Sequence, residues 1–376
     1  MHDELVPTGQ SDSIGGGLSM LPEFFDKIGH ENIVFHHDSR AGLKAIIAVY
    51  STALGPALGG VRFHAYSSAE NALSDALRLS QAMAYKNALA GLALGGGKAV
   101  IIGDPASDKT DALWRAYGRV VNSLRGSYIT APDSGTTATD MDAIARDCSY
   151  VAGRSRENSG TGDPSPATAY GVFRAMVACA EHVWGSPSLA GRRVGVAGVG
   201  KVGTALVKRL LQGGASVVVS DISDRAVEAV RRDHPEVDVA VDTEALASAD
   251  LDVYAPCALG GALDAHAVAR LRARVVCGAA NNQLAHDSVA DDLHAQRVLY
   301  APDYVVNAGG VIHAAQELAG LNREREAAVR VGRIYETTAE ILCQAAEDDV
   351  PPLKVAQQRA DERIRSAETA TAAVRG

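Results

Sequence analysis

A glycine-rich turn between two apolar segments constrains the fold more than any other feature of this chain of 376 residues. Residues 194–197 have the pattern of a buried strand, and residues 198–203 follow with the spacing G-x-G-x-x-G. We expect a helix over residues 204–212 and a second strand over residues 216–220, which ends at Asp221. A strand, this turn, a helix and a second strand form the opening unit of a doubly wound α/β sheet.

The three glycines of the turn have separate predicted roles in binding a dinucleotide. Gly198 permits the tight turn, Gly200 lets a pyrophosphate approach the backbone, and Gly203 lets the helix pack closely on the strand. The N-terminus of the helix then faces the phosphates. Asp221 can accept hydrogen bonds from both hydroxyls of the adenosine ribose and would repel a 2′-phosphate. Although Arg225 could attract such a phosphate, Asp221 stands at the strand end, so the sequence predicts NAD rather than NADP.

The composition is that of a globular protein, with 47% hydrophobic and 22% charged residues, which excludes whole-chain disorder. At about 150 residues per domain, the length favours two domains. The net charge of −9, without a dense Lys/Arg tract, disfavours nucleic acid as a partner. Since no stretch approaches the roughly 18 apolar residues of a membrane span and residues 1–17 lack a signal-peptide pattern, we expect a cytoplasmic protein with no membrane partner.

The five cysteines are far apart in the sequence and include no C-x-x-C pair. The histidines show no paired spacing typical of metal ligands either. We therefore expect reduced, mostly packed thiols and no metal site.

Strand and helix patterns alternate through the first 150 residues, which predicts α/β layers there. The expected strands cover residues 33–36, 43–50, 61–63 and 99–102, and the expected helices cover about residues 67–86 and 110–124. Ser67 and Glu70 have the spacing of a capping box for the first of these helices. Residues 153–166, rich in Gly, Pro and Ser/Thr, are the best candidate hinge. The residues from Pro351 onwards have the pattern of an exposed helix.

Two lysines near glycines are candidates for chemistry. Lys86 ends an apolar helix pattern, and Lys98 follows three glycines. A lysine in such a poorly solvated site has a lowered pKa, which suits a general base or an anion clamp, although most lysines are solvated surface charges. The glycines lack the spacing of a phosphate-binding loop for ATP. Asp133 lies in a turn-rich segment after a short strand, where its residue type suits a helix cap or a catalytic carboxylate.

Six segments occur in order around the nucleotide motif and together closely resemble the Glu/Leu/Phe/Val amino-acid dehydrogenases, particularly the branched-chain and aromatic members. They are residues 54–62 (LGPALGGVR), 85–86 (YK), 95–98 (GGGK), 132–133 (PD), 278–282 (GAANN) and 300–310 (YAPDYVVNAGG). The likeness covers about residues 30–350.

The resemblance implies a reaction and a role for each catalytic residue. Lys86 would hold the substrate α-carboxylate, helped by one of Asn281 and Asn282. Lys98, with its lowered pKa, would activate the water that attacks the imino acid, and Asp133 would exchange protons with the amino group. The family reaction is NAD-dependent, reversible oxidative deamination of an L-amino acid to a 2-oxo acid and ammonia, without a metal.

The same resemblance implies the remaining binding residues. It assigns substrate contacts to Gly60, Lys86, Asn282, Leu58, Ala131, Val311 and Ala314. It assigns cofactor contacts to Arg62, Thr168, Gly198, Gly200, Lys201, Val202, Gly203, Asp221, Ala258, Ala280 and Asn281.

The implied fold is α/β with two domains and an active-site cleft between them. An N-terminal α/β catalytic domain would cover residues 1–155, and a Rossmann-type dinucleotide-binding domain residues 156–324. A C-terminal segment, about residues 325–376, would pack back towards the first domain. The family also implies homo-oligomers.

The implied side-chain pocket is apolar. Glutamate members of the family carry a cationic residue where this chain has Leu58, and an apolar pocket would leave the glutamate γ-carboxylate unpaired, which excludes glutamate. Valine and leucine members usually have Val at the position of Ala314, so this pocket is deeper by about two methyl groups. Valine, leucine, isoleucine and phenylalanine all remain candidate substrates.

Two alternative functions use the same motif. One is a Rossmann dehydrogenase with a separate catalytic domain that acts on a C–OH or C=O substrate, like shikimate dehydrogenase, but such enzymes lack the glycine–lysine segment. The other is a non-catalytic NAD-binding relative. Its support is Ser134, which stands beside Asp133 where relatives have Val.

Overall fold

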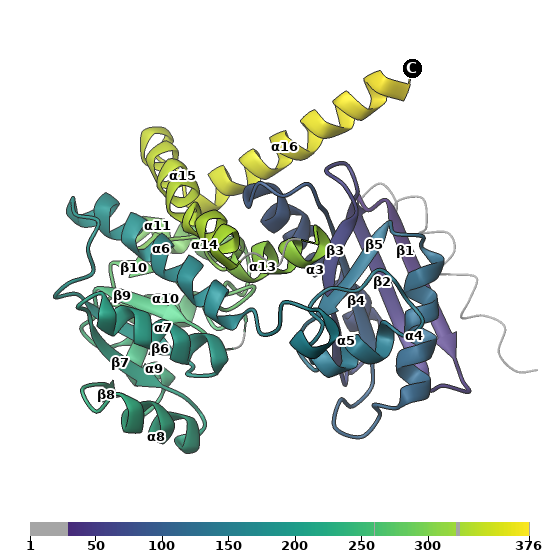
Figure 1. Cartoon of the computed structure of the whole chain (residues 1–376). Helices are drawn as coiled ribbons and strands as arrows, with labels where there is room; N and C mark the ends of the chain where they lie inside the picture. The colour runs from purple at the N-terminus through teal and green to yellow at the C-terminus, as the bar shows by residue number, and fades with distance from the viewer. Residues whose placement is uncertain (1–28, 259, 321–323, 376) are drawn as a thin grey trace, which may run out of the picture.

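The computed structural model describes residues 29–258, 260–320 and 324–375, so residues 1–28 of the first expected domain lie outside the described residues. The chain forms two sheets flanked by helices (Figure 1). The strand order is β1-β2-β4-β3-β5 in the first sheet and β11-β10-β9-β6-β7-β8 in the second. The predicted α/β class with two separate layered units is confirmed.

The first sheet is mixed and is covered on both faces. Its strands are β1 (Asn32–Asp38), β2 (Leu43–Ser51), β3 (Ala57–His64), β4 (Gly95–Ile102) and β5 (Tyr128–Pro132). Helix α3 (Ala69–Leu89) packs on one face through Ile46, Ala48 and Val100. Helices α4 (Asp111–Ser123) and α5 (Ala138–Ile144) cover the other face. Because both faces are buried, the central strands β2, β3 and β4 are mostly apolar on both faces rather than alternating.

The three glycines before Lys98 are part of β4 and let α3 lie close to it. A Cβ at Gly96 would stand 2.2 Å from the backbone N of Ala84 on α3, and one at Gly95 would stand 2.0 Å from the Ser51 carbonyl oxygen. A larger residue at Gly96 would push the helix away from the strand, whereas one at Gly95 would push away β2. Gly96 therefore lets the helix that carries Lys86 lie next to the strand that carries Lys98.

The predicted capping box at the start of α3 is wrong by one residue. Ser68 is the N-cap, and its side chain accepts a hydrogen bond from the Asn71 backbone N at 3.2 Å. The Ser67 hydroxyl accepts a hydrogen bond from the Asn71 side-chain amide instead. Two adjacent serines compete for the cap, and spacing alone does not distinguish them.

The second sheet is parallel, and its order matches the doubly wound nucleotide-binding fold. Its strands are β6 (Arg193–Ala197), β7 (Ser216–Ser220), β8 (Asp238–Val239), β9 (Val253–Pro256), β10 (Val275–Val276) and β11 (Leu299–Tyr300). Its helices are α6 (Ser165–Trp184), α7 (Lys201–Gln212), α8 (Asp224–Asp233), α9 (Thr243–Ala247), α10 (Ala265–Arg270) and α11 (Val289–Ala295). Helix α7 begins three residues earlier than expected, because Gly200 is already its N-cap.

The C-terminal helices connect the two sheets. They are α12 (Asp303–Val306), α13 (Gly309–Leu318), α14 (Glu324–Gly332), α15 (Ile334–Asp348) and α16 (Pro352–Arg375). Helix α15 lies along α6, and α16 crosses α3 before its end projects from the body (Figure 1). The expectation of an exposed helix after Pro351 is wrong for the first half of α16, where Leu353, Val355 and Ala360 are buried.

The cysteines are free, and most of them are packed as expected: Cys148, Cys179 and Cys277 are buried. Among the helices of the described ranges, none is both long enough and apolar enough to cross a membrane.

Candidate active site

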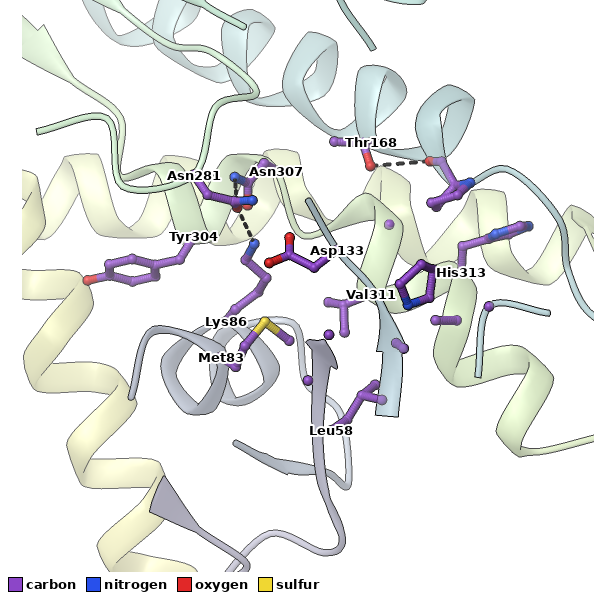
Figure 2. A pocket seen from close by; sticks show the side chains of 18 of the residues that line it. Leu58, Met83, Lys86, Asp133, Thr168, Asn281, Tyr304, Asn307, Val311 and His313 are labelled. Atoms are coloured by element: carbon purple, nitrogen blue, oxygen red, sulfur yellow. Dashed lines mark hydrogen bonds between the residues drawn. The ribbon is translucent and has the colours of Figure 1, made fainter. Parts of the chain in front are cut away.

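A cavity of about 260 Å³ lies between the first sheet with α3 and residues of the nucleotide-binding half. It brings together these residues selected from the sequence: Leu58, Gly60, Lys86, Lys98, Ala131, Asp133, Thr168, Val202, Asn281, Asn282, Val311 and Ala314. Figure 2 shows Lys86 and Asp133 pointing into the same space from different elements.

Lys98 and Asp133 form a buried ion pair in the cavity wall. The Lys98 Nζ lies 2.7 Å from the Asp133 Oδ2, and the two side chains are 6% and 15% exposed. Burial alone would raise the pKa of Asp133, but the charges of Lys98 and Arg62 outweigh it and lower this pKa to about 2. Asp133 is therefore ionised at neutral pH.

Arg62 forms a second ion pair with the Asp133 carboxylate. Its Nε donates to the Asp133 Oδ2 at 3.1 Å, and its terminal nitrogen donates to the Asp75 Oδ2 at 2.8 Å. Tyr66 donates its hydroxyl to the same Asp75 oxygen at 2.7 Å. Arg62 is thus held in an ion-pair network and is not among the residues that line the cavity. The cofactor contact that the family resemblance implies for Arg62 stays a prediction.

The turn that carries Asp133 is well formed with Ser134 in place. The Asp133 backbone N donates to the Thr136 hydroxyl at 2.8 Å, and the Thr136 N donates to the Asp133 carbonyl at 2.9 Å. The Ser134 carbonyl accepts from the Phe63 N at 3.0 Å, while its side chain is exposed. The Ser134 side chain therefore makes no contribution to the turn, and the support it gave to a non-catalytic relative is removed.

Lys86 approaches the cavity from the last turn of α3. Its Nζ donates to the Asn281 Oδ1 at 2.9 Å, and Asn307 donates its amide to the same oxygen at 2.9 Å. Burial lowers the pKa of Lys86 to about 8, against the attraction of the Asp303 carboxylate and with help from the charge of Lys98. The lowered pKa predicted for Lys86 is confirmed. The direct contact comes from Asn281, whereas Asn282, assigned to the substrate, lines the wall nearby.

The apolar end of the cavity is formed by β3, β5, α3 and α13. Leu58 and Ala131 lie on the first two elements, Met83 on α3, and Val311 and Ala314 on α13. Figure 2 labels Leu58, Met83 and Val311 among them. No cationic side chain stands at the position of Leu58, so this end suits an apolar substituent.

The nucleotide turn has the geometry expected of each glycine. Gly198 has a φ of 103°, and a Cβ on it would stand 2.8 Å from Ala258, which follows β9. A Cβ at Gly203 would stand 2.0 Å from the Gly198 carbonyl oxygen, whereas one at Gly200 would meet nothing within 4 Å. The first and last glycines are required by packing, and Gly200 is open to a ligand. The residues present therefore fit a dinucleotide.

Asp221 is oriented by the same turn. Its Oδ2 accepts from the Val199 N at 2.8 Å, and its Oδ1 accepts from the Ser223 N at 2.8 Å. Among the other residues assigned to the cofactor, Val202 and Thr168 line the cavity, Ala280 is buried beside Asn281, and Lys201 is exposed 3.8 Å from Asp163.

Several cavity residues were not selected from the sequence. Asp303 and Asn307 lie within the segment 300–310 that carried the family resemblance, so the signal for them was present. Burial raises the pKa of Asp303, although the charge of Lys86 opposes this. Thr161 had no such signal, because its contact with Glu317, which lies outside the cavity lining, joins segments far apart in the chain.

Comparison with known proteins supports the same family. A family model described as Glu/Leu/Phe/Val dehydrogenase, dimerisation domain, matches residues 30–150, and one described as Glutamate/Leucine/Phenylalanine/Valine dehydrogenase matches residues 223–371. The chain is 55% identical to a valine dehydrogenase of Streptomyces virginiae over 343 residues, covering 91% of this chain and 96% of the relative. It is 47% identical to a leucine dehydrogenase of Geobacillus stearothermophilus over 347 residues, covering 92% and 94%.

A solved structure extends the likeness to three dimensions. The L-tryptophan dehydrogenase from Nostoc punctiforme superposes with a TM-score of 0.79 at 40% identity, covering 93% of this chain and 99% of that one. The resemblance inferred from six short segments is therefore confirmed over nearly the whole length. The chain belongs to the Glu/Leu/Phe/Val dehydrogenase family.

Proposed function

We propose that this protein catalyses the NAD-dependent, reversible oxidative deamination of an apolar L-amino acid to its 2-oxo acid and ammonia. The observation that carries the proposal is the Lys98–Asp133 ion pair, which shares one cavity with Lys86. The same cavity is lined by Val202 of the nucleotide-binding turn. In the balanced reaction, the amino acid, water and NAD⁺ give the 2-oxo acid, ammonium, NADH and one proton. The names of the valine and leucine dehydrogenase relatives support this reaction.

Lys86 is the residue we assign to the substrate α-carboxylate. With a pKa of about 8 it is mostly charged at neutral pH, and Asn281 holds its Nζ at 2.9 Å. A charged, partly desolvated ammonium binds a carboxylate strongly. The substrate Cα would then lie between Lys86 and the Asp133 carboxylate.

Asp133 and Lys98 are the residues we assign to proton transfer. NAD, when bound, accepts a hydride from the substrate Cα. Asp133 accepts a hydrogen bond from the substrate amino group and takes its proton, since this carboxylate is ionised at neutral pH. Once Asp133 is protonated, Lys98, 2.7 Å away, accepts in its neutral form a proton from the water that adds to the imino carbon. Asp133 returns its proton to the nitrogen and the C–N bond breaks. Ammonia leaves as ammonium with the proton of the new hydroxyl group, which becomes the keto oxygen, and Lys98 releases the remaining proton.

NAD is the cofactor we assign, because Asp221 is held at the end of β7 by the Val199 and Ser223 N–H groups. A fixed carboxylate at this position suits two ribose hydroxyls and repels a phosphate. We also infer a homo-oligomer, for which the description of the matched dimerisation domain is the support. The proposed division remains a catalytic domain over residues 1–155 and a nucleotide-binding domain over residues 156–324.

An absorbance assay for NADH tests this function. We expect NADH to form with NAD and at least one of L-valine, L-leucine, L-isoleucine and L-phenylalanine, with less product from NADP and none from L-glutamate. The matching 2-hydroxy acids serve as the control for the alternative reaction at a C–OH group. Oxidation of a hydroxy acid, or inactivity on the whole amino-acid panel, would reject the proposal.

A further inference from the structure

The loop that precedes α6 has a polar anchor outside the proposed chemistry. The Glu317 Oε2 accepts hydrogen bonds from the Gly153 N at 3.1 Å, the Thr161 N at 3.1 Å and the Thr161 hydroxyl at 2.9 Å. Its Oε1 accepts one from the Arg154 N at 3.4 Å. These donors are three backbone N–H groups and one hydroxyl, so the carboxylate organises the backbone of the loop.

The anchor joins two parts of the cavity wall. Helix α13 carries Glu317 and also supplies Val311 and Ala314 to the cavity, and Ala314 lies three residues before Glu317 on the same side of the helix. The anchored loop supplies Gly153 and Thr161 to the same cavity. Glu317 therefore sets how closely the loop and the helix approach each other.

The loop transmits this position towards Asp133. Gly153 has a φ of 72°, and a Cβ on it would stand 2.4 Å from the Cδ of Pro132, the residue before Asp133. A Cβ at Gly160 would stand 2.0 Å from the Arg154 carbonyl oxygen, so the loop is tightly folded. Since Gly153 and Thr161 are buried, their N–H groups require a partner within the protein. A shift of the loop would therefore displace the part of the cavity wall that lies beside the Asp133 carboxylate.

We propose that Glu317 is a positioning residue that determines the shape of the substrate side-chain pocket, by holding the loop at residues 153–161 against α13. That this pocket holds the side chain of an amino acid rests on the proposed function. The contact between Glu317 and the loop is independent of that function. Glu317 can position the loop without transferring a proton or binding the cofactor.

The variant E317Q tests the proposal in the full-length enzyme. The amide keeps the length of the side chain but replaces one acceptor oxygen by an NH₂ group, which would face N–H donors. We expect KM for the preferred amino acid to rise by at least about tenfold, as for loss of hydrogen bonds to a charged group. We expect kcat to change less, and the ratio of kcat/KM between two apolar amino acids to shift by at least about threefold.

The matched control is E340Q. Glu340 is a glutamate on α15 whose ion pair with Arg359 lies on the surface at 2.9 Å. Its kinetics should equal those of the wild type. A glutamate needed only for folding would lower stability while leaving substrate ratios unchanged, and that result for E317Q would overturn the proposal.

Two changes at Thr161 keep the test decisive if E317Q does not fold. T161S keeps the hydroxyl that donates to Glu317, whereas T161V has the same shape without it. Because both variants change the cavity wall, they are compared with each other, and we expect KM to be several-fold higher in T161V than in T161S. Equal KM values in the two variants would overturn the proposal.

Amide hydrogen exchange separates this proposal from the proposed function. We expect the amides of Gly153, Arg154 and Thr161 to exchange at least about tenfold faster in E317Q, because they lose a charged acceptor. If the wild type oxidises no amino acid, the proposed function fails, and the exchange data still decide whether Glu317 holds the loop. Unchanged exchange would overturn that role, and so would faster exchange with an unchanged substrate ratio.

Discussion

At the scale of single residues, the ion pair between Lys98 and Asp133 depends on a residue without a side chain. Strand β3 lies between β4, which carries Lys98, and β5, which precedes Asp133. A Cβ at Gly60 on β3 would stand 2.8 Å from the Asp133 Cβ. With glycine there, the two side chains meet across the strand at 2.7 Å. The assignment of Gly60 to the site therefore has a physical reason in packing.

Replacing Lys98 and replacing Lys86 should change different kinetic constants. We expect K98A to lower kcat by about 100-fold or more, because the proton exchange with water is lost. We expect K86A chiefly to raise KM for the amino acid, because it binds the carboxylate. Steady-state kinetics measure both, and K44A, at an exposed lysine on β2, is the control. Near-normal turnover in K98A would remove Lys98 from the mechanism.

The pKa of Lys86 predicts how carboxylate binding depends on pH. Burial lowers this pKa to about 8, so the ammonium is present below pH 8 and is lost as the pH rises through it. We expect the affinity of the free enzyme for an apolar carboxylic acid without an amino group to fall by up to about tenfold per pH unit above that point. Calorimetric titration measures this, and K86R, charged throughout, should show a flat profile. A constant wild-type affinity from neutral to alkaline pH would contradict the assignment.

Ala314 predicts the size limit of the side-chain pocket. In A314V the added methyl groups fill space that only a longer substrate occupies, so use of the largest accepted amino acid should fall more than use of valine. The expected change in relative kcat/KM is about 1 to 3 kcal/mol, or roughly 10- to 200-fold. Ratios on one enzyme are compared, because a larger buried residue also strains the fold. Equal losses for all substrates would show that Ala314 does not limit the pocket.

At the scale of elements, the end of α3 that carries Lys86 is held by α16. Arg363 on α16 donates to the Ala88 carbonyl at 2.7 Å and to the Leu92 carbonyl at 3.2 Å. The Ala88 carbonyl, in the last turn of α3, also accepts from the Gly91 N at 3.1 Å, and Leu92 follows the end of the helix. An arginine at the C-terminus of a helix also interacts favourably with the helix dipole. The C-terminal helix therefore stabilises the position of the substrate-binding lysine.

Replacing this arginine should affect both stability and substrate binding. We expect R363A to lower the free energy of unfolding by about 1 to 3 kcal/mol, since it removes the charged donor of the Leu92 carbonyl and one of the donors of the Ala88 carbonyl. KM for the amino acid should rise while kcat changes little. Denaturant unfolding and steady-state kinetics measure the two effects. R365A is the matched control, because Arg365 is exposed on the same helix. Identical behaviour of the two variants would contradict the anchoring role.

At the scale of the whole molecule, the sequence predicts best what lies close together along the chain. The nucleotide turn, with its strands and helix, is a local pattern, and its glycines have the predicted geometry. The start of α3 was misplaced by one residue because Ser67 and Ser68 are equally suited to cap it. The family resemblance implied that Lys86, Lys98 and Asp133 meet. The spacing of these residues in the sequence could not predict that they meet, since this depends on the strand order β4-β3-β5.

Contacts between distant segments were the part that could not be predicted. Glu317 and Thr161 are 156 positions apart, and neither has a periodic or motif context. The buried face of α16 was missed for the same reason, because its apolar residues are few and lie among charges. Arg62 was assigned to the cofactor by resemblance, whereas its ion pairs with Asp75 and Asp133 follow from the fold.

The most direct test of the central claim is the ratio of ammonia released to NADH formed during oxidation of an apolar L-amino acid. If Lys86, Lys98 and Asp133 act on an amine as argued from their shared cavity, the wild type releases one ammonia for each NADH, and K98A loses both products together. The 2-oxo acid with ammonia and NADH should consume NADH in the same proportion. NADH formed without ammonia, or an enzyme that produces neither, would contradict the account.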